Sequence, residues 1–300
     1  MKHLKGFFAI SLAAVMWGLA ASVAKSFFNK AYEPLILVQM RVTLSFAVLF
    51  LFFLATNRSL LKFKIKDIPH FLVVGILGVA GSNYFYYAAI KESNVSTSIL
   101  VQYTAPIMVM LYSVLFQKEK LTGQKITALV FSIGGIFLAI GAYNPEIIQG
   151  TQKGVIFALL AAVSFSIFNI SGKSLTEKYS IWTGLIYLLG SATLFWSFIN
   201  TPVDIINANY SIEDWKVFGI IAVISILLPY SLYYYGLKHI QSSKAIIIST
   251  LEPVVAIISE WLFLNGRMGI VQILGAVCVI TAIVILQRES RNGEPIIVSD

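Results

Sequence analysis

The sequence has few of the residues that build catalytic and metal sites in soluble proteins. It contains one cysteine, Cys278, and three histidines, and charged residues make up 12% of its 300 residues. A single cysteine excludes an intrachain disulfide, and the histidines share no ligand spacing, so we expect no metal site and no cofactor. The charge content is about half that of an ordinary soluble domain, which excludes a soluble enzyme and a disordered chain.

The basic residues lack the arrangement that nucleic-acid binding requires. The formal net charge is +8, but the lysines and arginines lie in short gaps between apolar segments. They do not form a basic patch interleaved with aromatic residues on a polar element. The pattern is typical of the orientation signals of a membrane protein, and no nucleic-acid partner is expected.

What the sequence has in excess is apolar residues. They make up 58% of the chain, and the mean hydropathy is +0.82. A helix needs roughly 20 apolar residues to cross the hydrocarbon of a bilayer. Ten segments meet this requirement: 6–27, 34–56, 68–90, 95–116, 123–142, 154–172, 181–200, 214–236, 244–264 and 269–287. Because a backbone in lipid must satisfy its own hydrogen bonds, we predict an all-α integral membrane protein with ten transmembrane helices.

The distribution of basic residues predicts the orientation. When alternate gaps are counted, 15 of the 22 Lys and Arg residues fall on one side, six fall on the other, and Arg41 lies inside a segment. The richer side is expected to face the cytoplasm. Both termini, including a short tail at 288–300, are therefore predicted to be cytoplasmic in a protein of the plasma membrane. Residues 6–27 also resemble a secretory signal peptide, but the repeat described next needs this segment as a helix.

The second half of the chain repeats the first. Shifted by 148 positions, residues 6–26 lie on residues 154–174 and share the run LAAV. Shifted by 147, Tyr86–Pro106 lies on Tyr233–Pro253 with the Tyr-Tyr pair and the proline in register. A duplicated bundle without a transport role is the alternative to a functional repeat.

The repeat predicts two units, 6–142 and 154–287, with five crossings each. Five is an odd number, so the second unit starts from the opposite side of the membrane. Two such units related by a pseudo-two-fold axis in the membrane plane are a common plan of secondary transporters. We therefore predict an inverted 5+5 repeat.

The residues that repeat also carry a family resemblance. Trp17-Gly18, the run Tyr86–Thr122 and its counterpart Tyr234–Met268 resemble the EamA-type transporters of the drug/metabolite transporter superfamily. Glu119 fits the acidic position at the start of the fifth helix, whereas the second half has Gly266 there. The resemblance implies a secondary transporter of small metabolites, often an exporter of amino acids, and not an enzyme.

Three charged residues lie well inside the apolar segments, away from their ends: Arg41, Glu252 and Glu260. Charges at this depth are energetically expensive, roughly 2.5–3.5 kcal/mol each on insertion scales, so each is a candidate for substrate binding or coupling. Glu252 lies nearest the bilayer centre and is the first candidate for proton coupling. The alternatives are a structural hydrogen bond for Glu252 and a snorkelling side chain for Arg41. Arg41 and Glu260 lie at similar depth, and an ion pair between them is a further alternative.

Polar and aromatic side chains in the repeated helices are the remaining site candidates. Together with Glu252, the predicted substrate-binding residues are Trp17, Asn83, Tyr87, Gln102, Asn169, Tyr230 and Tyr234. Helix packing is the alternative for the deep residues, and an interfacial aromatic belt is the alternative for Tyr87 and Tyr234. Pro106 and Pro253 are expected to break the helices beside the site because proline removes a helical hydrogen bond.

These observations predict a transporter that moves a small polar or amphipathic substrate by alternating access, with amino-acid-like compounds and export as the first expectation. A sugar-phosphate or nucleotide-sugar exchanger would need several basic residues at mid-membrane, and only Arg41 is available. A sensor or assembly protein would need a soluble output domain, and no gap between segments is long enough for one. The sequence leaves open the substrate, the direction, the coupling ion and a homodimer as the oligomeric state.

Overall fold

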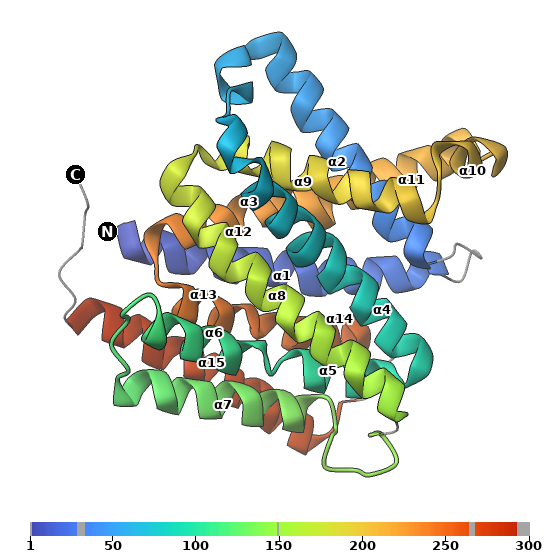
Figure 1. Ribbon diagram of the computed structural model, residues 1–300. Helices are drawn as coiled ribbons and strands as arrows, with labels where there is room; N and C mark the ends of the chain where they lie inside the picture. Colours follow the sequence, from blue (N-terminus) through green and yellow to red (C-terminus); the bar gives the residue numbers. More distant parts are fainter. Residues whose placement is uncertain (1, 29–33, 149, 264–267, 293–300) are drawn as a thin grey trace.

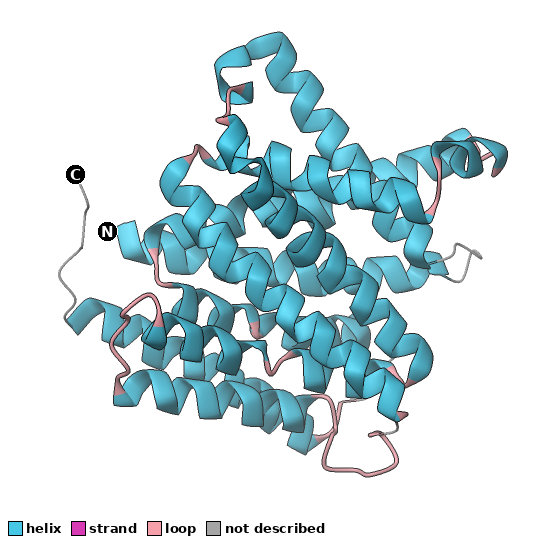
Figure 2. Cartoon of the chain, in the orientation of Figure 1, coloured by secondary structure: helices cyan, strands magenta, loops and turns pink. Residues whose placement is uncertain are grey.

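A computed structural model describes residues 2–28, 34–148, 150–263 and 268–292. In these ranges the chain forms helices and connecting loops, with no strand (Figure 2). The prediction of an all-α protein is confirmed. In chain order the elements are α1 (Lys2–Phe28), α2 (Pro34–Thr56), η1 (Arg58–Leu61), η2 (Ile65–Asp67), α3 (Ile68–Leu72), η3 (Val73–Ala80), α4 (Gly81–Glu92), α5 (Val95–Gln102), α6 (Ala105–Leu115), α7 (Gly123–Ala139), α8 (Gln152–Lys178), α9 (Ile181–Ile199), α10 (Pro202–Asn207), α11 (Ile212–Ala222), η4 (Val223–Leu227), α12 (Leu228–His239), α13 (Ser242–Ser249), α14 (Leu251–Phe263) and α15 (Ile270–Asn292).

Within the described ranges, nine helical stretches are long and apolar enough to cross a membrane. The fifth predicted span is shorter than the sequence suggested, because α7 has 17 residues and ends at Ala139. The chain then turns through Gly141, whose φ of 78° lies in the left-handed region that glycine adopts without strain. Because this span is too short in the structure, the total of ten transmembrane helices remains a prediction.

The spans that contain Pro106 and Pro253 are each divided into two helices. Helix α5 ends at Gln102 and α6 begins at Ala105, with Pro106 in its first turn. In the second half α13 ends at Ser249 and α14 begins at Leu251, so Pro253 again lies in the first turn. Proline is tolerated there because the first N–H groups of a helix have no partner within the helix.

A second backbone irregularity occurs in both halves. Val73–Ala80 (η3) is a π-helical stretch between α3 and α4, and Val223–Leu227 (η4) is another between α11 and α12. π-helical turns are rare, and they often lie at functional sites. At the 147-residue shift η4 falls within the counterpart of η3. The sequence repeat is therefore accompanied by a repeat in the backbone.

Small residues allow close packing of the helices in both halves of the chain. A Cβ on Gly75 would lie 2.3 Å from the Leu188 carbonyl oxygen of α9, and one on Gly78 would lie 3.0 Å from Phe168 Cα in α8. Gly135 and Gly275 bring α7 and α15 into backbone contact in the same way. A Cβ on Gly134 would meet nothing within 4 Å, so this neighbouring glycine takes no part in the close contact.

Figure 1 shows how these contacts arrange the bundle. Helix α8 crosses its front, α1 runs behind α8, and α7 and α15 lie side by side along the lower edge. The first turn of α1, the α6–α7 connection and the last turn of α15 lie at the same end of the bundle, which we call the basic end. Helix α15 continues to Asn292, so the predicted tail is helical at residues 288–292, and residues 293–300 lie outside the described part of the chain.

Candidate substrate-binding site

The candidate site is built on a close contact between α1 and α14. A Cβ on Gly18 would lie 2.6 Å from the Glu252 carbonyl oxygen and 2.9 Å from the Ala256 backbone nitrogen. Only glycine allows the two backbones to approach this closely. The neighbouring Trp17 is thereby held beside the first turn of α14, where Glu252 lies.

Aromatic rings from α8 and α12 pack around Trp17. Its ring meets Tyr230 edge-on, with centroids 5.7 Å apart, and lies 5.2 Å from Tyr233. Phe168 stacks on Tyr233 at 5.5 Å. Asn169 Nδ2 donates to the Tyr233 hydroxyl, which ties α8 to α12 in a fully buried contact. The four rings and one amide form a rigid wall between the two halves of the chain.

The positive charge of the site is held by a neutral amide. Arg41 donates from a guanidinium nitrogen to Asn83 Oδ1. Asn83 Nδ2 donates in turn to the Val79 carbonyl oxygen at 2.8 Å, and Val79 lies in the π-helical η3. This second bond fixes the amide so that its oxygen faces the arginine. Tyr230 lies within electrostatic reach of both Arg41 and Asn83.

The negative charge is held by a neutral phenol. Tyr103 Oη donates to Glu252 Oε2 at 2.9 Å, and the two residues are 149 positions apart in the chain. Tyr103 is the residue that follows α5 at its break, so the first half's broken helix contacts the second half's broken helix through this bond. Arg41 and Tyr86 both lie within electrostatic reach of Glu252.

These contacts bring together six of the residues predicted from the sequence. We define the central cluster as these six with Tyr103 and Tyr233: Trp17, Arg41, Asn83, Tyr103, Asn169, Tyr230, Tyr233 and Glu252. Three polar atoms at its margin lack a hydrogen-bond partner within the described chain, although all three are buried: Arg41 Nε, Asn169 Oδ1 and Tyr234 Oη. Buried polar atoms usually have a partner, so these groups are available to a ligand or to water.

The other predicted residues lie outside these contacts. Tyr234 is fully buried in the α8–α12 interface, where a Cβ on Gly172 would lie 2.7 Å from its hydroxyl. Tyr87 is half-buried and its ring meets that of Tyr86 edge-on, and half-buried Gln102 ends α5. Glu260 lies eight residues beyond Glu252 on α14, about 12 Å along the helix axis.

Two members of the central cluster, Tyr103 and Tyr233, were not among the predicted site residues. The sequence repeat aligns Tyr233 with Tyr86. A tyrosine present at the same position of both halves is a stronger signal than a lone aromatic residue, so Tyr233 could have been predicted. Tyr103 gives no such signal, since its counterpart is Thr250, the residue that follows α13 at its break. Its role depends on a contact between helices that are distant in sequence.

Two hollows on the described surface lie away from the central cluster. One of about 770 Å³ is lined by Leu4, Phe8 and Leu232, among others, between α1, α12 and α15. Another of about 270 Å³ lies between α2, α3 and α9. Neither includes a residue of the central cluster, and both are mainly apolar, as expected of surfaces that face lipid.

An all-helical bundle of long apolar helices, with opposite charges half-buried at its centre, defines a multi-pass membrane protein of the solute-transporter class. Comparison with known families specifies the class further. The EamA-like transporter family matches residues 4–141 and again residues 152–288. The chain belongs to this family and is a transporter rather than an enzyme.

Two named transporters and one solved structure also match most of the chain, at low sequence identity. The threonine/homoserine exporter RhtA of Escherichia coli (strain K12) is 23% identical over 276 residues, covering 91% of this chain and 87% of the relative. The riboflavin transporter ImpX of Fusobacterium nucleatum is 24% identical over 296 residues, covering 95% and 98%. A crystal structure matches with a TM-score of 0.75 at 18% identity, covering 97% of this chain and 99% of that one, which shows the fold alone.

Proposed function

We propose that the chain moves a small zwitterionic metabolite of the amino-acid type across the plasma membrane, in the export direction. The observation that carries this proposal is the pair of opposite charges in the central cluster. Arg41 and Glu252 lie within electrostatic reach of each other, and their hydrogen-bond partners are the neutral Asn83 and Tyr103. A substrate with a carboxylate and an ammonium group complements both charges.

The remaining groups of the cluster suit the rest of such a substrate. Arg41 Nε can donate to a substrate carboxylate, because it is buried without a partner in the described chain. An ammonium group beside Glu252 also lies near the faces of aromatic rings, which attract cations. The name of the relative RhtA, an exporter of two amino acids, supports the same substrate class and direction.

In this proposal, transport depends on movement of the two halves of the chain relative to each other. Each half contributes one broken helix, and the two breaks meet at the Tyr103–Glu252 bond. Two units of opposite topology have two packings of similar energy, one open to each side, and exchange between them is alternating access. The excess of basic residues at one side supports cytoplasmic termini. A reporter fused after Asp300 should read as cytoplasmic, and an external signal would contradict this placement.

Counterflow in proteoliposomes tests the substrate class. Vesicles are loaded with threonine, homoserine, ethanolamine or lactate, and uptake of labelled threonine is followed. We expect the two zwitterions to drive uptake at least about tenfold faster than either singly charged probe, since each charge contributes a charge-assisted hydrogen bond. Equal rates with ethanolamine or lactate would overturn the proposal, as would no uptake with any probe. Vesicles containing the Arg41→Gln variant are the control for specific transport.

A further inference from the structure

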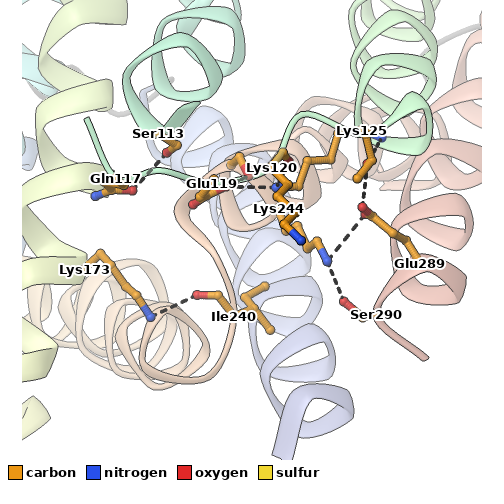
Figure 3. Close-up of polar contacts among 12 residues, drawn as sticks. Ser113, Gln117, Glu119, Lys120, Lys125, Lys173, Ile240, Lys244, Glu289 and Ser290 are labelled. Carbon is orange, nitrogen blue, oxygen red and sulfur yellow. Dashed lines mark hydrogen bonds and ion pairs between the residues drawn. The ribbon is translucent and has the colours of Figure 1, made fainter. Parts of the chain in front are cut away.

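A second group of charges is buried at the basic end of the bundle, outside the central cluster (Figure 3). Lys125 at the start of α7 and Lys244 at the start of α13 are at most 3% exposed, and Glu119 and Glu289 are less than 10% exposed. Buried charges are costly unless they are paired and hydrogen-bonded. We call these four residues, with Thr122 and Ser243, the end cluster.

The first carboxylate of the end cluster belongs to the first half of the chain. Glu119 lies in the α6–α7 connection, and its Oε2 is 3.1 Å from Lys125 Nζ in the same half. Lys125 also donates to the Lys120 carbonyl oxygen at 3.0 Å. The same Glu119 oxygen accepts a hydrogen bond from the hydroxyl of Ser243, which lies in the first turn of α13 in the second half.

The second carboxylate belongs to the second half of the chain and accepts its hydroxyl bond from the first half. Glu289 lies in the last turns of α15, and Lys244 of the same half is 3.5 Å from its Oε2. Lys244 also donates to Ser290 Oγ at 2.9 Å. Glu289 Oε1 accepts a hydrogen bond at 2.5 Å from the hydroxyl of Thr122, the residue that caps α7 in the first half.

Each half therefore holds a carboxylate that is neutralised by its own lysine and bound by a hydroxyl of the other half. We propose that this reciprocal pair of hydroxyl–carboxylate bonds is a latch that keeps the basic end of the transporter closed, and that it opens when the site is exposed to this side. The inference rests on the proposed alternating access. Its physical basis is that both bonds can break while each carboxylate keeps its ion pair, so opening leaves no uncompensated charge.

The packing of α7 against α15 supports such a movement. Thr122 and Glu289 join these helices at the basic end. The same helices touch through their backbones further along, where a Cβ on Gly275 would lie 2.4 Å from the Ala139 backbone nitrogen. A close contact without long side chains can act as a pivot, because the helices can change their crossing angle there without unpacking a core. Opening at the basic end would then break the two hydroxyl bonds while the contact at the pivot is kept.

Accessibility of a buried cysteine tests the latch without any substrate. Ser113 in α6 is fully buried beneath the end cluster, where its hydroxyl donates to Gln117 Oε1 at 3.0 Å. Ser113→Cys is introduced together with Cys278→Ser, and a membrane-impermeant maleimide is added to the basic side in inverted vesicles. We expect Ser243→Ala to speed labelling about tenfold, because it removes one charge-assisted hydrogen bond and leaves Lys125 paired with Glu119.

Thr122→Asp tests the second bond. Aspartate preserves the cap of α7 but cannot donate to Glu289, so labelling at pH 8 should also rise about tenfold. Adding Glu289→Gln to this variant restores a donor–acceptor pair with the roles exchanged, and it should return labelling to the parent rate. Thr122→Ser keeps the hydroxyl and should match the parent.

The matched control removes the same kinds of hydroxyl elsewhere. In Thr281→Val/Ser197→Ala both lost hydroxyls bond only the carbonyl four residues back in their own helix. Parent-rate labelling in this control is expected. The latch is overturned by unchanged labelling in Ser243→Ala and Thr122→Asp, by an equal rise in the control, or by failure of the Glu289→Gln rescue. A change in labelling without amino-acid counterflow would leave the latch standing and reject the proposed substrate instead.

Discussion

The centre of the molecule and its basic end both contain opposite charges, but their hydrogen-bond and ion-pair partners differ. At the basic end each carboxylate has a lysine of its own half within 3.5 Å. At the centre Glu252 is bonded by the phenol of Tyr103, and Arg41 by the amide of Asn83. The charges at the end are thus compensated within the protein, whereas those at the centre are oriented but not neutralised by a direct ion pair.

This difference separates structural charges from charges available to a ligand. A buried ion pair mainly avoids the penalty of a lone charge, so removal of one partner is felt as lost stability. A charge that is held in position by a neutral group keeps its capacity to bind an ion of opposite sign. The same substitution should therefore have opposite consequences in the two regions.

The largest expected effect is on stability at the basic end. Glu119→Gln should lower the free energy of unfolding by about 3 kcal/mol, because it leaves Lys125 buried without its carboxylate. Thermal unfolding in detergent measures this loss. The substrate KM should change by less than about threefold, because Glu119 lies outside the central cluster and the oxygen of glutamine can still accept the bond from Ser243. An unchanged melting temperature would show that the two regions do not differ as described.

Glu252→Gln should have the opposite effects, lowering transport without lowering stability. We expect kcat/KM for a zwitterionic substrate to fall about 10- to 100-fold, the range for loss of a hydrogen bond to a charged group. The melting temperature should stay at or above that of the parent, because a half-buried charge is removed while the amide can still accept the Tyr103 bond. Counterflow rates and melting curves on the same preparation test both parts, and a destabilised variant with normal transport would reverse the assignment.

The proposed pivot gives the next effect in size. Gly275→Ala places a methyl group 2.4 Å from the Ala139 backbone nitrogen, so overpacking should lower the free energy of unfolding by about 1–3 kcal/mol. Gly134→Ala is the matched control, since its methyl group would meet nothing within 4 Å and alanine favours the helix. Equal melting temperatures for the two variants would show that α7 and α15 are not in close contact.

The smallest effect concerns the position of the arginine. Asn83→Ala removes the amide that holds Arg41 and should weaken binding of carboxylate-bearing substrates about fivefold, close to 1 kcal/mol. Competition assays should show no matching change for an amine that lacks the carboxylate. A similar loss with both kinds of competitor would mean that Asn83 supports the fold instead of positioning Arg41.

The sequence predicts the fold well because lipid imposes strong local rules. Long apolar runs give the spans, and Pro106 and Pro253 give the two helix breaks. The site is predicted less completely. Charges in gaps between spans suggest orientation alone, so the burial of Lys125 and Lys244 is not visible in the sequence. The bonds that join the two halves of the chain link residues more than 120 positions apart, such as Tyr103 and Glu252 or Ser243 and Glu119, and only the packed helices bring them together.

The π-helical stretch η3 determines the direction in which Asn83 points. Successive residues of an α-helix are rotated by about 100° around its axis, so one residue added to a turn rotates every later side chain by that angle. Asn83 follows η3 by three positions and bonds the Val79 carbonyl within it. Deleting one residue from η3 would leave the span and its composition nearly unchanged, yet it would turn the amide away from Arg41. The helical phase set by this irregular turn is thus as much a part of the site as the side chains themselves.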